Sequence, residues 1–288
     1  MNDKTFHQLV QLNKDFYENI YEEFNLTRQS PWQGWNAVVD ICNKKFAGVK
    51  KTKILDLGCG NGRFFKFLYE NAKFDFDYYG VDASSRLLKI AEKTIKTKYD
   101  TVKSDDFKGF QDDGVTKIQI KANKKHANSS VYFIKFDIIS KISELQNIFS
   151  IYKLPRHYDI ATVFGVTHHI PSNEYRKKWF LVVSNLIKEG GILAYTFWQY
   201  DNDINRFSKK FKDIAIDRYR IDKSDLDSGD YFLSFSNSDF LRYVHIYNEN
   251  EKMDIRNELN NMNLIKSFKS DGKTKNLNEY FIFEKENK

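Results

Sequence analysis

The sequence predicts a doubly wound α/β fold whose seven-stranded sheet is parallel except for one strand. Apolar strand patterns alternate with helical patterns along most of the chain, which is typical of a parallel sheet covered by helices on both faces. The last two strand patterns are separated only by the turn 271–274, which favours an antiparallel pair. The expected strands are residues 53–57, 77–81, 131–136, 159–164, 192–197, 264–270 and 279–283.

Helix signals fall between these strands. Segment 1–48 is expected to be helical and to dock on the sheet, because its apolar residues recur at helical spacing. These residues are Leu9, Leu12, Phe16, Ile20 and Phe24. A helix should begin at 63–68, Ser84 should cap the next one, and Ser172 should cap a later helix that ends at 190–191.

A chain of 288 residues with 41% hydrophobic content can bury a large core, and we expect one domain over 1–288. Two stretches stand outside the regular alternation. Residues 98–130 are polar and rich in Lys, Asp and Asn, so they are expected to form an inserted, solvated loop. Residues 201–247 mix aromatic and charged side chains after the fifth strand, and we expect them to form a substrate lid.

Composition indicates where in the cell the protein is expected and which kind of partner it is expected to bind. No apolar run approaches the roughly 20 residues that cross a bilayer, and residues 1–6 have no signal-peptide pattern. The two cysteines, Cys42 and Cys59, do not make a disulfide framework. A cytoplasmic protein without membrane contact is therefore expected. The net charge of +7 favours an anionic partner such as RNA.

The most informative motif lies where the first strand enters a turn with three glycines, Gly58, Gly60 and Gly62. Glycine has no Cβ, so a ligand can approach the backbone closely. Asp56 precedes the turn, and Asp82 ends the second strand at the distance where a carboxylate can hold two ribose hydroxyls. The spacing differs from the G-x-G-x-x-G of dinucleotide binders, so a nicotinamide cofactor is the less favoured alternative.

This arrangement resembles the first motif of class I S-adenosylmethionine (SAM) methyltransferases, which have a Rossmann-like fold. The resemblance implies SAM as the cofactor. The expected cofactor-binding residues at this motif are Asp56, Gly58, Gly60, Gly62 and Asp82.

Later strand ends carry further candidates. Asp137 ends the third strand, where an acid commonly accepts a hydrogen bond from an adenine amino group. Phe164 ends the fourth strand, and Gly165 after it allows close approach of the methionine part of SAM. Of His168 and His169, one is expected to pack and the other to bind substrate, with His169 as the candidate. No metal site is expected, because no Cys or carboxylate lies at ligand spacing.

Two more specific segments, Thr27 to Trp32 and Arg242 to His245, resemble the tRNA wobble carboxymethyluridine methyltransferases. The resemblance implies methyl transfer to the carboxylate of a modified uridine in tRNA. It also implies Arg28 in the cofactor site and a possible small activating partner protein. The chain departs from that family at Thr167, in the stretch 98–130 and at 271–280.

A carboxylate acceptor with a pKa of roughly 4 is ionised near pH 7, so it needs no general base. It needs a cation or a donor that orients it. The candidates for that role are Arg28, His169, Arg242 and His245. Trp32 and Trp198 are candidates for stacking on a base. The spacing of Arg242 and His245 puts them on one face of a helix but on opposite faces of a strand.

Two other functions stay open at this point. The same scaffold can methylate a small carboxylic acid or another metabolite, or it can bind SAM without turnover. An exposed basic groove beside the pocket would favour tRNA, and a closed apolar pocket would favour a metabolite.

Overall fold

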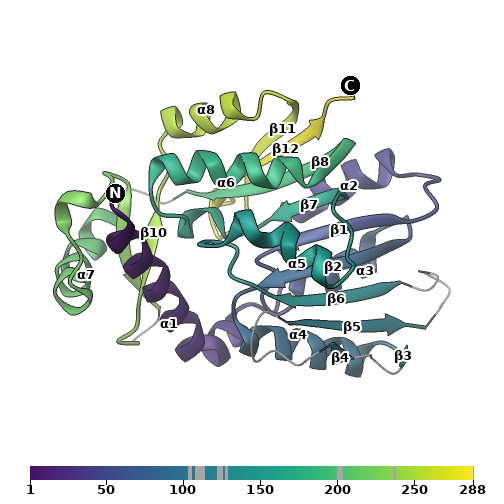
Figure 1. The fold of residues 1–288 in the computed structure, drawn as a ribbon, viewed down its shortest axis with the longest axis horizontal. Coiled ribbons are helices and arrows are strands. Elements are labelled where there is room, and N and C mark those ends of the chain that lie inside the picture. Colours follow the sequence, from purple (N-terminus) through teal and green to yellow (C-terminus); the bar gives the residue numbers. More distant parts are fainter. Residues whose placement is uncertain are drawn as a thin grey trace.

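The computed structural model describes residues 1–102, 106–107, 114–121, 126, 129–199, 204–235 and 238–287. Within these residues the main sheet has ten strands in the order β11-β12-β8-β7-β1-β2-β6-β5-β3, and β4 pairs with β5 beside this path (Figure 1). Its strands are β1 Thr52–Leu57, β2 Phe76–Asp82, β3 Thr101–Val102, β4 Asp106–Phe107, β5 Val115–Ile120, β6 Ser130–Lys135, β7 Tyr158–Val163, β8 Ile187–Trp198, β11 Met262–Ser270 and β12 Asn278–Lys285.

The predicted seven-stranded sheet is confirmed as the core of this larger one. Strands β1, β2, β6, β7 and β8 pair in parallel. Strand β12 runs antiparallel between β8 and β11, as the turn between the last two strands predicts.

Helices cover both faces of the sheet (Figure 1). One face packs against α2 Trp35–Lys45, α3 Arg63–Asn71 and α4 Ser85–Lys98, and the other packs against α5 Leu145–Ile151, α6 Asn173–Asn185 and α8 Glu249–Glu258. Strand β1 serves both cores, with Ile54 on the first face and Leu55 and Leu57 on the second. Ser84 caps α4 as predicted, since its Oγ accepts a hydrogen bond from the Leu87 amide at 3.3 Å.

Some local predictions were wrong. The stretch 98–130 is not only a loop: β5 pairs antiparallel with β6, and its Ile118 and Ile120 are buried in the core, so two well-placed apolar residues outweigh the polar composition. The parts of this stretch beyond 98–102, 106–107, 114–121, 126 and 129–130 lie outside the described residues. Residues 190–191 do not end a helix but lie inside β8, where the pairing with β7 shifts register.

A second, smaller sheet stands at one end of the main sheet. It pairs β9 Asp230–Ser234 with β10 Leu241–His245 in antiparallel fashion. Helix α1 Asp3–Thr27 packs on β10, and α7 Ile204–Tyr219 packs on β9 (Figure 1). Three short 3-10 turns complete the described elements: η1 Ile142–Glu144, η2 Thr167–His169 and η3 Lys223–Asp225.

The N-terminal segment 1–48 and the segment 201–247 therefore meet, although about two hundred residues separate them. Leu9 and Leu12 of α1 share one apolar cluster with Phe232 and Tyr243 of the small sheet. Residues 201–203 and 236–237 of the predicted lid lie outside the described residues. In the part of the chain that the structure describes, each helix is too short or too polar to span a bilayer.

Candidate active site

A cavity of about 580 Å³ opens at the carboxyl ends of the parallel strands. One wall is formed by residues that end or follow β1, β2, β6, β7 and β8, and the facing wall is formed by α1 and by Arg242 of β10. Open α/β sheets bind ligands at this edge, and the volume is within the range of roughly 300–1,000 Å³ that small-molecule sites occupy.

The glycine turn forms the floor of the cavity. Gly58 has φ +80°, and its amide donates to the Val81 carbonyl at 2.7 Å, which ties the turn to β2. A Cβ on Gly58 would lie only 2.1 Å from Cγ2 of Val166, whereas a Cβ on Gly60 would meet nothing within 4 Å. Gly58 therefore lets the turn pack against the end of β7, and Gly60 leaves open space above the backbone. Gly62 packs against Ala91 of α4.

Gly58→Ala should destabilise the protein by more than Gly60→Ala. Both positions have positive φ, which costs a residue with a Cβ about 1–2 kcal/mol, but only Gly58→Ala adds a clash with Val166. Thermal unfolding of the two variants measures the difference. Adding Val166→Ala should restore part of the stability of Gly58→Ala, and equal melting temperatures for the two single variants would contradict this packing.

Two acidic residues of the motif, Asp56 and Asp82, stabilise the glycine turn and the strands beside it through hydrogen bonds. Oδ2 of Asp82 accepts from the Gly60 amide and Oδ1 accepts from the Ser84 amide, both at 2.8 Å. Asp56 is buried and accepts from the hydroxyls of Tyr78 at 2.5 Å and Thr162 at 2.8 Å. Burial raises the pKa of each carboxyl to about 6. Both residues line the cavity as predicted, but Asp82 is the more exposed of the two.

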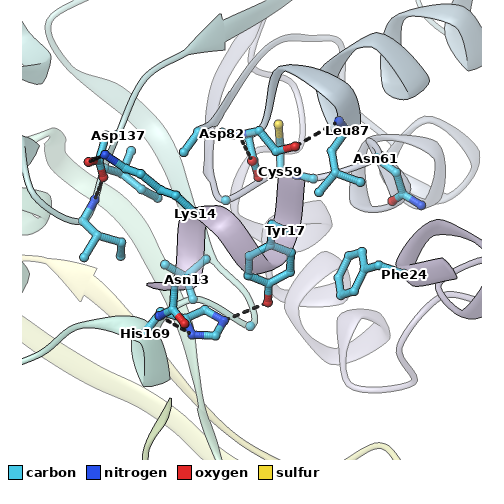
Figure 2. Close-up of a pocket in the computed structure, with 18 of the residues that line it drawn as sticks. Asn13, Lys14, Tyr17, Phe24, Cys59, Asn61, Asp82, Leu87, Asp137 and His169 are labelled. Carbon is cyan, nitrogen blue, oxygen red and sulfur yellow. Dashed lines mark hydrogen bonds and ion pairs between the residues drawn. The ribbon is translucent and has the colours of Figure 1, made fainter. Parts of the chain in front are cut away.

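At the predicted adenine end, Asp137 also lines the cavity, and its carboxylate forms an ion pair with Lys14 of α1 (Figure 2). Its Oδ2 lies 2.6 Å from Nζ of Lys14 and also accepts from the Ser140 hydroxyl. Burial would raise the pKa of Asp137, but the bonds from Lys14 and Ser140 outweigh it and lower that pKa below its usual value. An adenine amino group would share this carboxylate with Lys14, a residue that the sequence did not single out.

The predicted methionine end is aromatic and carries two guanidinium groups. Phe164 is buried there, and the Trp32 ring lies over Gly165. The Arg63 guanidinium stands 5.1 Å from the centre of the Trp32 ring, and Arg28 lines the same side of the cavity. Arginine forks suit a carboxylate such as that of an amino acid. Arg63 was missed, although its place directly after Gly62 is a usable signal.

Both ring nitrogens of His169 are hydrogen-bonded to other residues of the chain, so neither is left for a ligand (Figure 2). Its Nδ1 lies 3.0 Å from the Tyr243 carbonyl, which can only accept, so Nδ1 donates. Its Nε2 then accepts from the Tyr17 hydroxyl at 2.8 Å. Asn13 holds the Tyr243 backbone that bonds His169, because its Oδ1 accepts a hydrogen bond from the Tyr243 amide at 2.8 Å. Tyr17 and Asn13 were missed, although both lie one position after the buried stripe of α1.

Trp198 does not offer a free face for a base. The His168 ring stacks on it at 3.9 Å with an interplanar angle of 3°, and the Arg242 guanidinium lies 4.8 Å from its centre. The expectation that Trp198 stacks on a nucleobase is therefore corrected: its surface packs against the two side chains that flank it.

Arg242 is a buried cation in the cavity. Its side chain is 5% exposed, and none of the described carboxylates lies within ion-pair distance of it. Its Nε has no hydrogen-bond partner among the described residues. Burial, together with the charge of Arg242, lowers the pKa of His169 to about 3 and that of His168 well below its usual value. Both histidines are therefore neutral at physiological pH.

His245 does not reach the cavity. Because β10 is extended, Arg242 and His245 face opposite sides of it. The ring of His245 is fully buried, with Nδ1 at 2.7 Å from Asp230 and Nε2 at 2.9 Å from Glu251. The prediction that His245 holds the acceptor is thus corrected, and its role is to join β9, β10 and α8.

Comparisons with known proteins identify the family of the chain. A family model described as a methyltransferase domain matches residues 33–235. The chain is 29% identical over 121 residues to carboxy-S-adenosyl-L-methionine synthase of Campylobacter hominis, covering 38% of this chain and 50% of that protein. The Campylobacter jejuni protein of the same name is 29% identical over 100 residues, covering 33% and 41%. The chain thus spans about half the length of the curated relatives it matches.

Two solved structures share the fold. A SAM-dependent methyltransferase from Clostridium acetobutylicum superposes with a TM-score of 0.55 at 16% identity, covering 95% of this chain and 99% of that one. The 1,6-didemethyltoxoflavin-N1-methyltransferase of Burkholderia thailandensis, solved with 1,6-didemethyltoxoflavin and S-adenosylhomocysteine, gives 0.56 at 11% identity, covering 100% and 92%. In this chain, the glycine turn that carries Gly58 and Gly60, with Asp82 beside it, leaves open backbone that fits an adenosyl cofactor such as SAM. The chain belongs to the methyltransferase domain family.

Proposed function

We propose that the protein transfers the methyl group of SAM to the carboxylate of a small acid. The observation that carries the proposal is Arg242, a buried cation that lines the cavity without a carboxylate partner among the described residues. A buried charge without a partner is costly, so a cavity that keeps one is suited to an anionic ligand.

The titration of His169 and Tyr17, which line the cavity beside Arg242, supports the same acceptor. His169 has a pKa of about 3 and cannot remove a proton near neutral pH. Burial also raises the pKa of the Tyr17 hydroxyl, which stays protonated. An alcohol or a protonated amine would need a base, whereas a carboxylate with a pKa of roughly 4 arrives ionised.

The chemistry then rests on orientation. SAM, when bound, supplies a methyl group on a positively charged sulfur. A lone pair of the carboxylate oxygen forms the new O–C bond while the C–S bond breaks and its electron pair goes to sulfur, so no proton moves. Arg242 orients the carboxylate toward the methyl group.

A small acid suits this cavity better than a tRNA base does. The side chains on the acceptor side, His168, Trp198 and Arg242, are each less than a tenth exposed, so the surrounding chain covers them. A nucleotide in a folded RNA would require this cover to open, whereas a small acid would not. The carboxymethylated wobble uridine of tRNA, which the sequence resemblance implies, is the runner-up.

A second candidate follows from the same guanidinium. The curated relatives are named carboxy-SAM synthases. Arg242 would equally suit a carboxylate carried on the sulfonium itself, which would make the modified cofactor the product.

An acceptor panel separates these functions. The protein is incubated with SAM and, in separate reactions, with small carboxylic acids, matched amines and phenols, and tRNA that carries carboxymethyluridine. We expect S-adenosylhomocysteine to accumulate with the small acids and a methyl ester to form. Methylation of the amines or phenols, methylation of tRNA alone, or a carboxylated cofactor detected by mass would overturn the proposal.

The pH dependence of SAM binding provides another prediction. Asp82 titrates with a pKa of about 6, so SAM affinity should be constant above that pH and fall as the pH drops through it, by up to about tenfold per unit. The methyl-transfer rate at saturating SAM should stay flat from about pH 7 to pH 9, because the pKa of His169 is lowered to about 3 and that of Tyr17 is raised above its usual value. Calorimetry and initial rates measure both. Asp82→Asn should make the acidic limb shallower, leaving the part that Asp56 contributes, and a rate that rises tenfold per pH unit above pH 7 would contradict the carboxylate acceptor.

A further inference from the structure

The two adjacent histidines of η2 have different environments. Both ring nitrogens of His169 are bonded, to Tyr17 and to the Tyr243 carbonyl. His168 is 1% exposed and lines the cavity, yet its Nδ1 has no hydrogen-bond partner among the described residues. The residue with spare hydrogen-bonding capacity is therefore His168, not His169.

Neighbouring side chains hold the His168 ring in place but leave its Nδ1 without a hydrogen-bond partner among the described residues. Its face stacks on Trp198 at 3.9 Å, which fixes the plane of the ring. The ring is neutral, because burial, and with it the nearby charge of Arg242, lowers its pKa well below the usual value. A neutral imidazole offers one donor and one acceptor. A buried polar group without a partner destabilises a site unless a ligand or water satisfies it.

Arg242 and His168 contact the same Trp198 ring, so one small molecule can reach both. We propose that His168 hydrogen-bonds a neutral polar group of the acceptor, which makes the substrate a carboxylic acid with a hydroxyl or oxo group rather than a plain acid. This inference rests on the proposed function, since Arg242 holds the carboxylate in both. His168 is then a specificity-determining residue, and Arg242 supplies the charge.

The test compares matched acids on the complex of the protein with S-adenosylhomocysteine, where binding is measured by calorimetry without turnover. The probes are phenylacetate, mandelate and phenylglyoxylate, which differ only in the group next to the carboxylate, and benzoate with its three monohydroxy isomers. The variant His168→Phe keeps an aromatic ring against Trp198 and removes both nitrogens. His168→Asn retains a donor and an acceptor. His7→Phe, at an exposed position of α1, is the matched control.

We expect the protein to bind at least one hydroxy or oxo acid about tenfold more tightly than its plain parent, as one hydrogen bond in a closed site allows. The ratio should fall to about one in His168→Phe, with the affinity for the parent acid unchanged. It should recover in part in His168→Asn and stay as in the wild type in His7→Phe.

An unchanged ratio in His168→Phe, or the lack of any preference over the parent acids, overturns the role of His168. Methyl transfer to the acids without any effect of His168→Phe overturns this inference alone. Acids that bind in a His168-dependent way but receive no methyl group overturn the proposed function and leave the binding role intact. Binding of no acid in the panel overturns both.

Discussion

Replacing Arg242 by Met should lower kcat/KM for a carboxylate acceptor by about 100-fold or more, because a buried, charge-assisted hydrogen-bonding partner is lost. Met keeps most of the apolar stem of the side chain and removes the guanidinium, which lies over the Phe16 and Trp198 rings. The SAM dissociation constant should hardly change, since the guanidinium of Arg242 lies over Phe16 and Trp198 and not over the glycine turn that carries Gly58 and Gly60. Methyl-transfer kinetics and calorimetry on the same folded variant measure both quantities.

Two further substitutions sharpen this test. Arg242→Lys keeps the charge but not the two-pronged donor geometry, so it should recover only part of the activity. Arg218→Met removes an exposed arginine of α7 in the same segment and should leave activity unchanged. Normal turnover in Arg242→Met would contradict an acceptor role. A loss of SAM binding in parallel with activity would place Arg242 in the cofactor site instead.

Asp82→Ala should weaken SAM binding by about 100-fold, the scale expected when hydrogen bonds to a charged group are lost. The carboxylate holds the Gly60 and Ser84 amides at 2.8 Å and lines the cavity where the ribose is expected. Asp254→Ala, which removes an acid of α8 paired with Lys177, is the matched control. Calorimetry with SAM decides, and an unchanged affinity in folded Asp82→Ala would remove Asp82 from the cofactor site.

The cofactor side of the site was predictable because its signals are local. The glycine turn, Asp82 and the strand ends at Asp137 and Phe164 are all recognisable from short stretches of sequence, and all of them except Gly62 line one cavity. Parallel strands align their carboxyl ends at one edge of the sheet, so placing the strands also places these residues.

The acceptor side was not predictable in the same way, because long-range packing decides it. The contacts from α1 to His169 join residues 156 and 152 positions apart, and the Lys14–Asp137 pair joins α1 to the end of β6. The roles of Arg242 and His245 depended on whether residues 242–245 form a helix or a strand. The polar stretch 98–130 looked like a loop because its apolar residues are few, although Val115, Ile118 and Ile120 of β5 are buried.

The central claim is that a carboxylate held by Arg242 receives the methyl group of SAM. The most direct measurement uses SAM labelled in its methyl group, with a carboxylic acid that the protein binds, and follows the label after mild alkaline hydrolysis. A methyl ester releases its label as methanol, while a methyl on nitrogen, carbon or an ether oxygen does not. We predict alkali-labile label in the product, in amounts equal to the S-adenosylhomocysteine formed, and its loss in Arg242→Met. Alkali-stable label, or ester formation that Arg242→Met leaves unchanged, would contradict the claim.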